Sequence, residues 1–252
     1  MADLEVQFLG SGDAFSSGGR FHTCILVSSD TTRFLVDCGA SSMVAMRRFG
    51  VEPNDLEMIL ITHLHGDHYG GLPFFMLDAR LVSRRTQPLR LVGPPGLEVR
   101  YRQLMEALFA GTSQAEPKFP LVFEELQPGQ VFSYMAHSGE EIQVEPFEVA
   151  HSSGSLSFAY RIACGDKKLA YTGDTSWCEG IVQAAKETDL LITECCSYEK
   201  ELRNHLNYQT LQAHREELKT PRIIYTHMNM DMLEKVPQLV GEFASDGKVF
   251  RI

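Results

Sequence analysis

The chain has 252 residues, 44% hydrophobic and 22% charged, and a formal net charge of −10. This ordinary globular composition excludes collagen, coiled-coil and disordered classes, and the acidic balance argues against broad nucleic-acid binding. No apolar run approaches the roughly 20 residues of a membrane span, and the start MADLEVQ has acids where a signal peptide has bases. Six cysteines without a CxxC pair favour reduced thiols and a cytoplasmic location.

Strand-like runs alternate with helical stretches along the chain. In the first half we expect strands at 4–10, 22–29, 32–37 and 56–62, helices at 40–50 and 96–111, and turns over 112–140. In the second half we expect strands at 141–149, 155–163, 168–173, 189–195, 221–228 and 247–252, and helices at 177–187, 207–218 and 231–241. Two sets of strands, each followed by helices, predict an α/β fold, a four-layer αββα sandwich. With no repeat or linker, residues 1–252 are predicted to form a single domain.

The densest chemical signal is the run HLHGDH at 63–68, directly after the predicted strand LEMILIT. An extended backbone points alternate side chains to the same side, so His63 and His65 can bind one ion together. The glycine of the run permits a sharp turn, which would direct Asp67 and His68 towards a second ion. A surface cluster of histidines is the alternative interpretation. It does not explain why so many ligands follow a strand, where α/β folds place their sites.

Three further candidate ligands, His151, Asp174 and His227, also follow predicted strands. Each alone is more often a structural residue, but all three recur at the same edge of the fold as the HLHGDH run. Imidazole and carboxylate ligands without thiolate suit Zn²⁺ or Mn²⁺, and they suit a catalytic rather than a structural site. The sequence therefore predicts two divalent metal ions.

Together with FLGSGDAF, DCGAS, THLHGDHYGGLP, VGPPGL, SFAY and TGDT, these residues resemble the metallo-β-lactamase superfamily over nearly the whole chain. Within it, the chain is most similar to the ribonuclease Z-like branch. The resemblance implies the metallo-β-lactamase fold and a dinuclear centre. In that centre one metal would be held by His63, His65 and His151, and the other by Asp67, His68 and His227, with Asp174 bridging.

His205 lies in RNHLN, just before the predicted helix at 207–218, where it is also a plausible N-terminal turn residue beside capping asparagines. In ribonuclease Z-like phosphodiesterases a histidine at this place protonates the leaving group. The segment NHLNYQTL resembles the cyclic phosphodiesterase of bacterial phosphonate breakdown. Glu194 matches a family carboxylate that orients this histidine; the alternative is an ordinary acid at a strand end. The resemblance thus implies that His205, Glu194 and Asp67 are catalytic.

The chain departs from the ribonucleases Z that mature tRNA, which usually carry a protruding basic arm after the third metal histidine. Here one hairpin with the turn GDKK fills the interval between His151 and Asp174, and Ala159 replaces the usual glycine. The N-terminal cysteine cluster of the phosphonate-pathway enzyme is missing as well. Without the arm a tRNA body would lose its main electrostatic anchor, so tRNA is disfavoured as a partner.

Two smaller sets of residues complete the candidate site. Asp37 and Thr62 are expected to support the metal ligands from behind. Six arginines from Arg80 to Arg102 cluster in sequence with few acids between them. They are interpreted either as a solvated face or as a phosphate or nucleotide contact, because arginine favours bidentate phosphate binding.

The predicted function is a metal-dependent phosphodiesterase acting on a small phosphodiester, cyclic or nucleotide-like. Two ions would clamp the phosphate and lower the pKa of a shared water to roughly 7. The metal-bridged hydroxide would attack phosphorus in line, and protonated His205, held by Glu194, would donate to the leaving alkoxide.

Three alternatives remain open at this stage. The first is a tRNA 3′-processing endonuclease whose arm comes from a partner chain. The second is a lactone or carboxylic ester hydrolase with the same metals and no need of His205. The third is a metal-bound scaffold or sensor without turnover. The expected partner is a small-molecule substrate. No membrane partner is expected, and a homodimer is left open.

Overall fold

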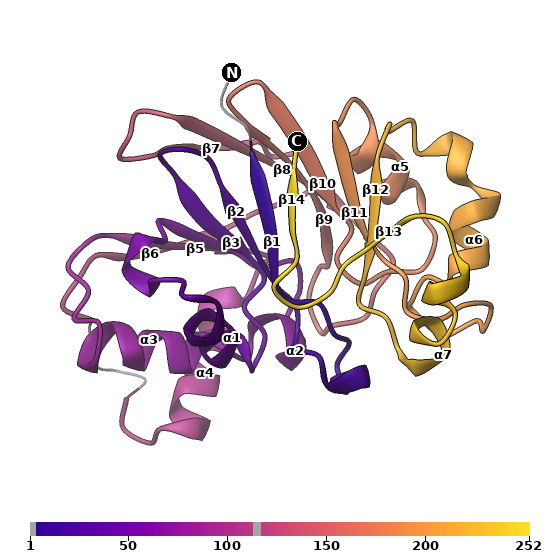
Figure 1. Cartoon of the computed structure of the whole chain (residues 1–252). Coiled ribbons are helices and arrows are strands. Elements are labelled where there is room, and N and C mark those ends of the chain that lie inside the picture. Colours follow the sequence, from indigo (N-terminus) through magenta and orange to yellow (C-terminus); the bar gives the residue numbers. More distant parts are fainter. Residues whose placement is uncertain (1–3, 113–116) are drawn as a thin grey trace.

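The computed structural model describes residues 4–112 and 117–252 and has the expected αββα sandwich architecture (Figure 1). Within these residues the strands form two mixed seven-stranded sheets. Across the first sheet the order is β14 (Val249–Arg251), β1 (Glu5–Gly10), β2 (Cys24–Ser28), β3 (Arg33–Val36), β4 (Met58–Leu60), β5 (Leu89–Gly93) and β6 (Leu121–Glu125). Across the second it is β13 (Glu242–Phe243), β12 (Ile223–Thr226), β11 (Leu190–Glu194), β10 (Lys167–Tyr171), β9 (Phe158–Cys164), β8 (Glu141–Glu148) and β7 (Phe132–Met135).

Helices cover the outer face of each sheet (Figure 1). The first sheet is covered by α1 (Ser42–Phe49), α3 (Leu72–Leu81) and α4 (Leu97–Leu108), and the second by α5 (Glu179–Ala185), α6 (Tyr208–Ala213) and α7 (Met230–Leu233). The short α2 (Gly66–Tyr69) lies at the lower edge of the sandwich in Figure 1. Among the described residues, no helix has both the length and the apolar character needed to cross a lipid bilayer.

The central layer is an apolar core packed between the two sheets. Strand β2 shows how the sequence builds it. Ile25 and Val27 face this core, whereas Cys24 and Leu26 pack under the helices on the other side. Successive side chains of a strand point to opposite faces, and both faces of this strand are buried. This is why the strand has a continuous apolar sequence instead of an alternating one.

The parallel half of each sheet positions the candidate site. Strands β3 to β6 are parallel in the first sheet, and β10 to β13 are parallel in the second. The segments after β4, β10 and β12 therefore leave their sheets at carboxyl ends, where α/β folds place ligands. Gly173 lets two of these segments meet, because it has φ +57° and an added Cβ would lie 3.0 Å from Thr62 Cβ.

The expected elements are mostly present, but several boundaries are wrong. The expected turns over 112–140 include strands β6 and β7, and residues 113–116 of that segment lie outside the described residues. Helix α3 and strand β5 were not expected. The expected helix at 231–241 is divided into α7 and a 3₁₀ turn at Val236–Gln238, because Pro237 lacks a backbone N–H donor.

A buried hydrogen bond joins the two sheets directly beneath the site. The Tyr160 hydroxyl on β9 donates to the carbonyl of Ile61, the residue after β4, at 2.8 Å. Tyr160→Phe should lower the free energy of unfolding by about 1–2 kcal/mol, because a buried carbonyl loses its donor. Urea denaturation measures this loss. Tyr198→Phe is the matched control, since the described structure gives the Tyr198 hydroxyl no hydrogen bond, and equal losses in both variants would contradict the assignment.

Candidate metal centre

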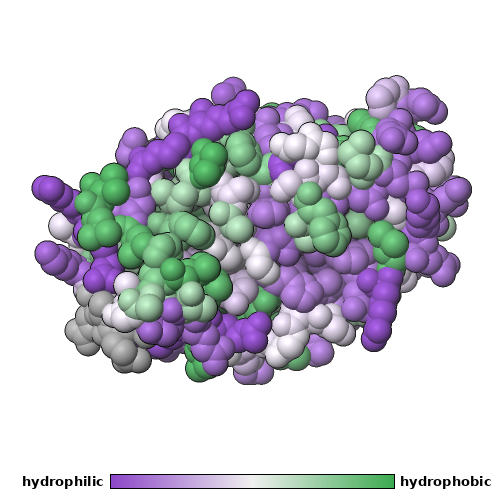
Figure 2. Space-filling model, turned by 90° about the horizontal axis from the view of Figure 1, so that it is seen from below, coloured by the Kyte–Doolittle hydropathy of each residue, from purple (hydrophilic) through white to green (hydrophobic). Residues whose placement is uncertain are grey.

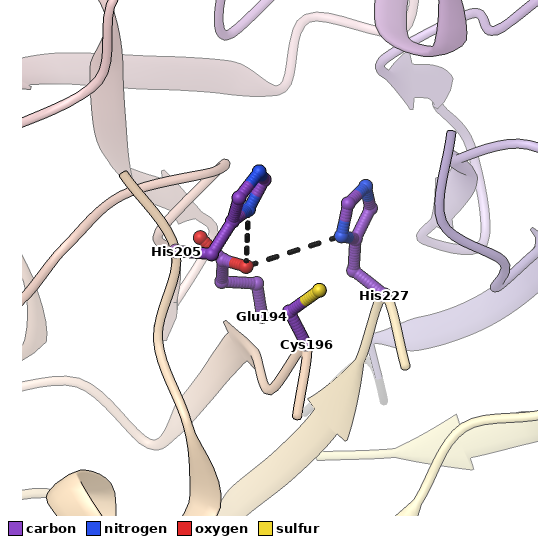
Figure 3. Close-up of side chains that lie close together, drawn as sticks. All are labelled: Glu194, Cys196, His205 and His227. Atoms are coloured by element: carbon purple, nitrogen blue, oxygen red, sulfur yellow. Dashed lines mark hydrogen bonds and ion pairs between the residues drawn. The ribbon is translucent and has the colours of Figure 1, made fainter. Parts of the chain in front are cut away.

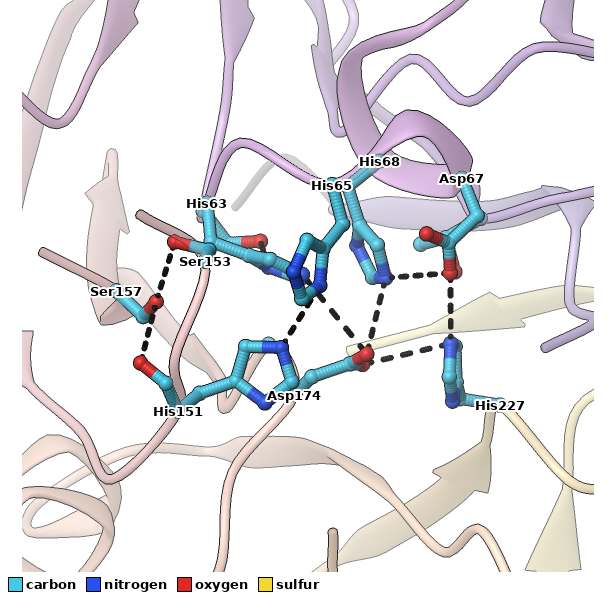
Figure 4. Close-up of polar contacts among 12 residues, drawn as sticks. His63, His65, Asp67, His68, His151, Ser153, Ser157, Asp174 and His227 are labelled. Carbon is cyan, nitrogen blue, oxygen red and sulfur yellow. Dashed lines mark hydrogen bonds and ion pairs between the residues drawn. The ribbon is translucent and has the colours of Figure 1, made fainter. Parts of the chain in front are cut away.

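All seven residues expected to bind metal come together at one edge of the sandwich (Figure 4). They come from segments distant in the chain: the turn into α2, the segment after β8, and the segments after β10 and β12. Their ligand atoms fall into two adjoining groups, within each of which the atoms lie within 4.8 Å of one another. The first group is His63, His65 and His151, and the second is Asp67, His68, Asp174 and His227.

The first group consists of three imidazoles. His63 is fully buried, and His151 Nε2 lies 3.0 Å from His65 Nδ1. His151 Nδ1 is 2.9 Å from the carbonyl oxygen of Asn204, to which it can only donate. That bond assigns the proton to Nδ1 and leaves the lone pair of His151 Nε2 directed into the group.

The second group is built around carboxylate oxygens. Asp67 Oδ2 is 3.2 Å from His68 Nε2 and 3.3 Å from His227 Nε2. Asp174 lies between the groups: its Oδ2 is 3.4 Å from His68 Nε2 and 3.9 Å from His63 Nε2, while its Oδ1 is 3.4 Å from His227 Nε2. Asp174 is therefore a carboxylate that contacts both groups.

The cluster fits a metal site because it buries polar atoms that lack hydrogen bonds. Within the described residues, His63 Nε2, His68 Nε2 and Asp174 Oδ1 are inaccessible to solvent and have no hydrogen-bond partner. Buried groups of this kind are nearly always satisfied in proteins. A divalent cation bound by these nitrogen and oxygen atoms would satisfy all three atoms together.

The electrostatics of the cluster lead to the same conclusion. Burial by itself would raise the pKa of Asp174, but the charges of His227 and His68 outweigh it and hold that pKa well below its ordinary value. Burial lowers the pKa of His63, and the neighbouring His68 lowers it further. For His68 and His227 the negative charge of Asp174 overcomes burial and raises the pKa. A metal ion would therefore compete with protons for these nitrogens, because metal ligands must be deprotonated.

Asp37 and Thr62 lie behind the ligands. The Asp37 Oδ2 atom is 2.7 Å from His68 Nδ1, and the backbone N–H and hydroxyl of Thr62 also donate to this carboxylate. The Thr62 hydroxyl oxygen lies 3.0 Å from His63 Nδ1. Asp37 is fully buried and has φ 61°, a left-handed conformation that the surrounding bonds must hold in place. These contacts orient the two imidazoles.

His205 lies beside the cluster and is paired with Glu194 (Figure 3). His205 Nδ1 is 3.0 Å from Glu194 Oε2 and 3.8 Å from Asp174 Oδ2. Glu194 is fully buried, and its other oxygen accepts the backbone N–H of Thr175. The His205 side chain is 26% exposed, so its remaining nitrogen, Nε2, is available to a ligand.

The pKa values of this pair are shifted together. Burial lowers the pKa of His205, but the hydrogen bond and charge of Glu194 outweigh it and raise that pKa above its ordinary value. Burial, and then the charge of Asp174, raises the pKa of Glu194. Both shifts favour retention of a proton between the two side chains near neutral pH.

Cys196 is a neighbour of the site that the sequence did not reveal. It is a buried residue that follows just after strand β11. Its sulfur, however, lies in one cluster with Glu194, His205 and the Nδ1 face of His227 (Figure 3). Alternation was the available signal, because Cys196 follows Glu194 by two residues and an extended backbone places both on the same side.

The arginines from 80 to 102 do not form one surface. Arg85 is buried and donates to four backbone carbonyls. Arg90 and Arg102 form ion pairs with glutamates. Arg100 is different, because it lines a cavity next to the cluster and has no ion pair within the described residues. Three of the six arginines are therefore held by contacts within the protein, and Arg100 lies near the candidate site.

The fold and the His/Asp cluster together define a metal-dependent hydrolase of the metallo-β-lactamase fold, which confirms the predicted class. Over residues 4–250 the chain matches the family model of the anti-Pycsar protein Apyc1, and it belongs to that family.

Solved structures and curated proteins agree with this class. The metallo-β-lactamase fold protein YhfI from Bacillus subtilis superimposes with a TM-score of 0.78 at 20% identity, over 100% of both chains. A diphosphatase of the PhnP family gives 0.76 at 18% identity, over 99% of this chain and 98% of the other. Ribonuclease Z of Methanothermobacter thermautotrophicus is 29% identical over 76% of this chain and 74% of its own length. The chain spans about half of other curated ribonucleases Z, namely 46% of one from Haloferax volcanii and 55% of one from Listeria welshimeri.

Divalent metal should stabilise this protein markedly. Zn²⁺ or Mn²⁺ at 100 times its dissociation constant should raise the melting temperature of chelator-treated protein by about 5–10 °C. Differential scanning calorimetry measures the shift. Asp174→Ala should lose most of it, whereas His214→Ala, a surface histidine stacked on Trp177, should keep it. An unchanged melting temperature with either metal would exclude a metal site at this cluster.

Proposed function

We propose that this chain is a dinuclear metal-dependent phosphodiesterase that hydrolyses a small phosphodiester, cyclic or nucleotide-like. His205 is its general acid, and Glu194 orients His205. The bridging ligand is Asp174. The remaining ligands are His63, His65 and His151 for one ion, and Asp67, His68 and His227 for the other.

The observation that carries this proposal is the His205–Glu194 pair beside the cluster. When bound, the two metals supply Lewis acidity and a water of lowered pKa. His205 contributes the second half of hydrolysis, because a proton on Nε2 can pass to the leaving oxygen while Glu194 fixes the tautomer through Nδ1. An alkoxide leaving from phosphorus requires such a proton. His205 is not among the seven ligands proposed here, although its ring nitrogen also lies within 4.8 Å of ligand atoms of His151 and Asp174.

The size of the substrate is inferred from the hairpin between His151 and Asp174. Strands β9 (Phe158–Cys164) and β10 (Lys167–Tyr171) are joined by a turn of two residues, so no arm protrudes from this interval. With a net charge of −10 as well, the chain has little to hold the backbone of a long polyanion. These features support a small phosphodiester.

Ribonuclease Z activity is the second candidate, because the curated relatives carry that name. Pre-tRNA binding would then depend on surfaces other than the β9–β10 hairpin. Hydrolysis of a lactone or carboxylic ester is a weaker candidate, because it would leave the His205–Glu194 pair without a chemical role.

The metal-loaded protein should hydrolyse small diesters faster than it processes pre-tRNA. We expect turnover of bis-p-nitrophenyl phosphate and of 2′,3′- or 3′,5′-cyclic nucleotides, measured by absorbance and by phosphorus NMR of the products. Pre-tRNA and a γ-lactone serve as the competing substrates. Efficient 3′ cleavage of pre-tRNA by the purified chain alone would overturn the choice of substrate, and preference for the lactone would overturn the reaction.

The loss of rate on removal of the general acid should depend on the leaving group. His205→Ala should lower kcat on a diester with an alkyl leaving group by about 10²–10⁴-fold, because the alkoxide leaves unprotonated. The loss should shrink for p-nitrophenyl esters, whose leaving anion needs little protonation. Metal content, measured by mass spectrometry, should not change. Wild-type rates on alkyl diesters would show that His205 is only a helix-start residue.

The Glu194→Gln variant tests the His205–Glu194 pair through the pH dependence of kcat. The proton on His205 is lost as pH rises through its pKa, and the rate with alkyl leaving groups falls with it. Because Glu194 raises that pKa, its neutral replacement should move the alkaline limb of the pH–kcat profile to lower pH. An unmoved limb would contradict a role for Glu194 in holding the proton.

A further inference from the structure

A second group of metal-binding side chains adjoins the candidate metal centre. Its members come from three segments: the end of β11 with the residues just after it, the turn before α6, and the residue after β12. Their ligand atoms lie within 4.8 Å of one another (Figure 3). We call this group the Cys196 cluster; it consists of Glu194, Cys196, His205 and the Nδ1 atom of His227.

One nitrogen of the Cys196 cluster has no hydrogen bond. His227 is 1% exposed, and its Nε2 atom faces Asp67 and Asp174 in the metal centre. Its Nδ1 atom points the other way, into the Cys196 cluster, where it is buried and unpartnered in the described structure. The Cys196 sulfur lies nearby but does not have hydrogen-bond geometry towards this nitrogen. Since buried polar atoms nearly always have a partner, the unpartnered nitrogen indicates that the cluster binds a ligand.

The spacing of the cluster fits one tetrahedral zinc ion. Glu194 Oε2 lies 3.0 Å from His205 Nδ1 and 3.9 Å from His227 Nδ1. Bond lengths of about 2.0–2.3 Å place the ligand atoms of tetrahedral zinc about 3.3–3.6 Å apart, which is between these two distances. A carboxylate, a sulfur and two imidazole nitrogens are also ligands that zinc accepts.

The backbone around Cys196 holds the three segments together. The Cys196 N–H donates to the carbonyl of Leu206, the residue after His205. The Cys196 carbonyl accepts the N–H of Asn229, which follows His227 closely in the sequence. His227 itself has φ 56°, a left-handed conformation that its surroundings must maintain. The ligand atoms are therefore brought together by the chain itself, so a metal ion can bind without a large rearrangement.

The thiol distinguishes the Cys196 cluster from the main centre, whose candidate ligands are imidazoles and carboxylates. Sulfur ligands favour Zn²⁺, whereas Mn²⁺ prefers oxygen ligands. Zinc would displace the thiol proton of Cys196, the ring proton on His227 Nδ1 and the proton held by the His205–Glu194 pair. The negative charges then present on Cys196, His227 and Glu194 offset the charge of a third cation beside the first two. Because protons must leave, this third ion binds more weakly than the others.

The Cys196 cluster is accessible through His205. The His205 side chain is 26% exposed, and it lines a cavity of about 500 Å³ with Ser176 and Trp177. The cavity lies on the half of the molecule that carries α6, and the lower face of that half is more polar than the half with α3 and α4 (Figure 2). A hydrated cation can therefore approach Glu194 and Cys196, which are otherwise buried.

We propose that the Cys196 cluster is a third metal site, which binds Zn²⁺ in excess of the two ions of the main centre and does not bind Mn²⁺. Zinc at this site inhibits hydrolysis, because a His205 ring coordinated through Nδ1 is neutral and no longer supplies a proton to the leaving group. The inhibition rests on the proposed role of His205 as general acid, whereas zinc binding does not. The alternative is an N–H···S hydrogen bond between His227 and Cys196 without any metal.

Cobalt reports the sulfur ligand directly. Co²⁺ substitutes for Zn²⁺, and a thiolate ligand gives it a charge-transfer band in the near ultraviolet that imidazole and carboxylate ligands do not give. We expect no band with two equivalents of Co²⁺ and a band with the third. The band should be absent in Cys196→Ala and retained in Cys195→Ala. Cys195 is the matched control, because it is fully buried among apolar side chains beneath the outer helices.

Equilibrium dialysis gives a second measurement without turnover. With excess Zn²⁺ the wild-type protein should retain three ions per chain, and Cys196→Ala should retain two. With excess Mn²⁺ both proteins should retain two. The melting temperature with two equivalents of metal shows that the variants are folded.

Zinc inhibition should be specific to poor leaving groups. Saturation of the third site should lower the rate on a diester with an alkyl leaving group by about 10²-fold or more. The rate on bis-p-nitrophenyl phosphate should change little. Cys196→Ala should keep its rate on both substrates, as should the wild-type protein in excess Mn²⁺, whereas Cys195→Ala should be inhibited like the wild type.

The outcomes separate the third site from the function on which the inhibition rests. If neither diester is hydrolysed with two equivalents of metal, the phosphodiesterase proposal fails, and the cobalt band alone decides the site. Wild-type protein that binds two ions and gives no band overturns the third site and favours the hydrogen bond between His227 and Cys196. A band without loss of rate on the alkyl diester overturns the inhibition, as does inhibition that persists in Cys196→Ala.

Discussion

The rest of the site depends on one electrostatic constraint: a carboxylate and several imidazoles are buried together where water cannot reach them. Asp174 is 2% exposed, and His63 and His68 are fully buried beside it. Buried charges cost several kcal/mol each unless they are well paired, and His63 Nε2, His68 Nε2 and Asp174 Oδ1 have no hydrogen-bond partner within the described residues. A bound divalent cation would resolve that conflict. Asp37, which has a left-handed backbone conformation, accepts a hydrogen bond from His68 and holds that imidazole in place.

The sandwich makes this arrangement possible because it directs the parallel ends of two sheets to one edge. Four segments distant in sequence supply the ligands there, while the two outer helical layers are free to differ. On one side lies the His205–Glu194 pair, which is the general acid and its orienting carboxylate in the function proposed above. On the other side α3 and α4 leave an apolar cavity.

Much of this was available from the sequence, and the reason is physical. The HLHGDH run has ligands at spacings that only a strand followed by a tight turn can use, and the strand patterns gave the four layers. Helix α3 and strands β5 to β7 were not predicted, because their apolar residues alternate weakly or lie among prolines. Contacts made by backbone atoms, such as the Asn204 carbonyl on His151, have no residue-type signature. The cavity between α3 and α4 was not predicted, because its lining residues come from elements that are separate in the sequence.

The central claim is that the cations lie around Asp174, and anomalous diffraction from crystals grown with Mn²⁺ tests it most directly. We predict two peaks per chain, one among His63, His65 and His151 and one among Asp67, His68 and His227, with Asp174 between them. A neighbouring cluster of Glu194, Cys196, His205 and the Nδ1 face of His227 offers a competing position. A single peak would contradict the dinuclear centre, and a peak at that second cluster would contradict the role of His205 as an acid.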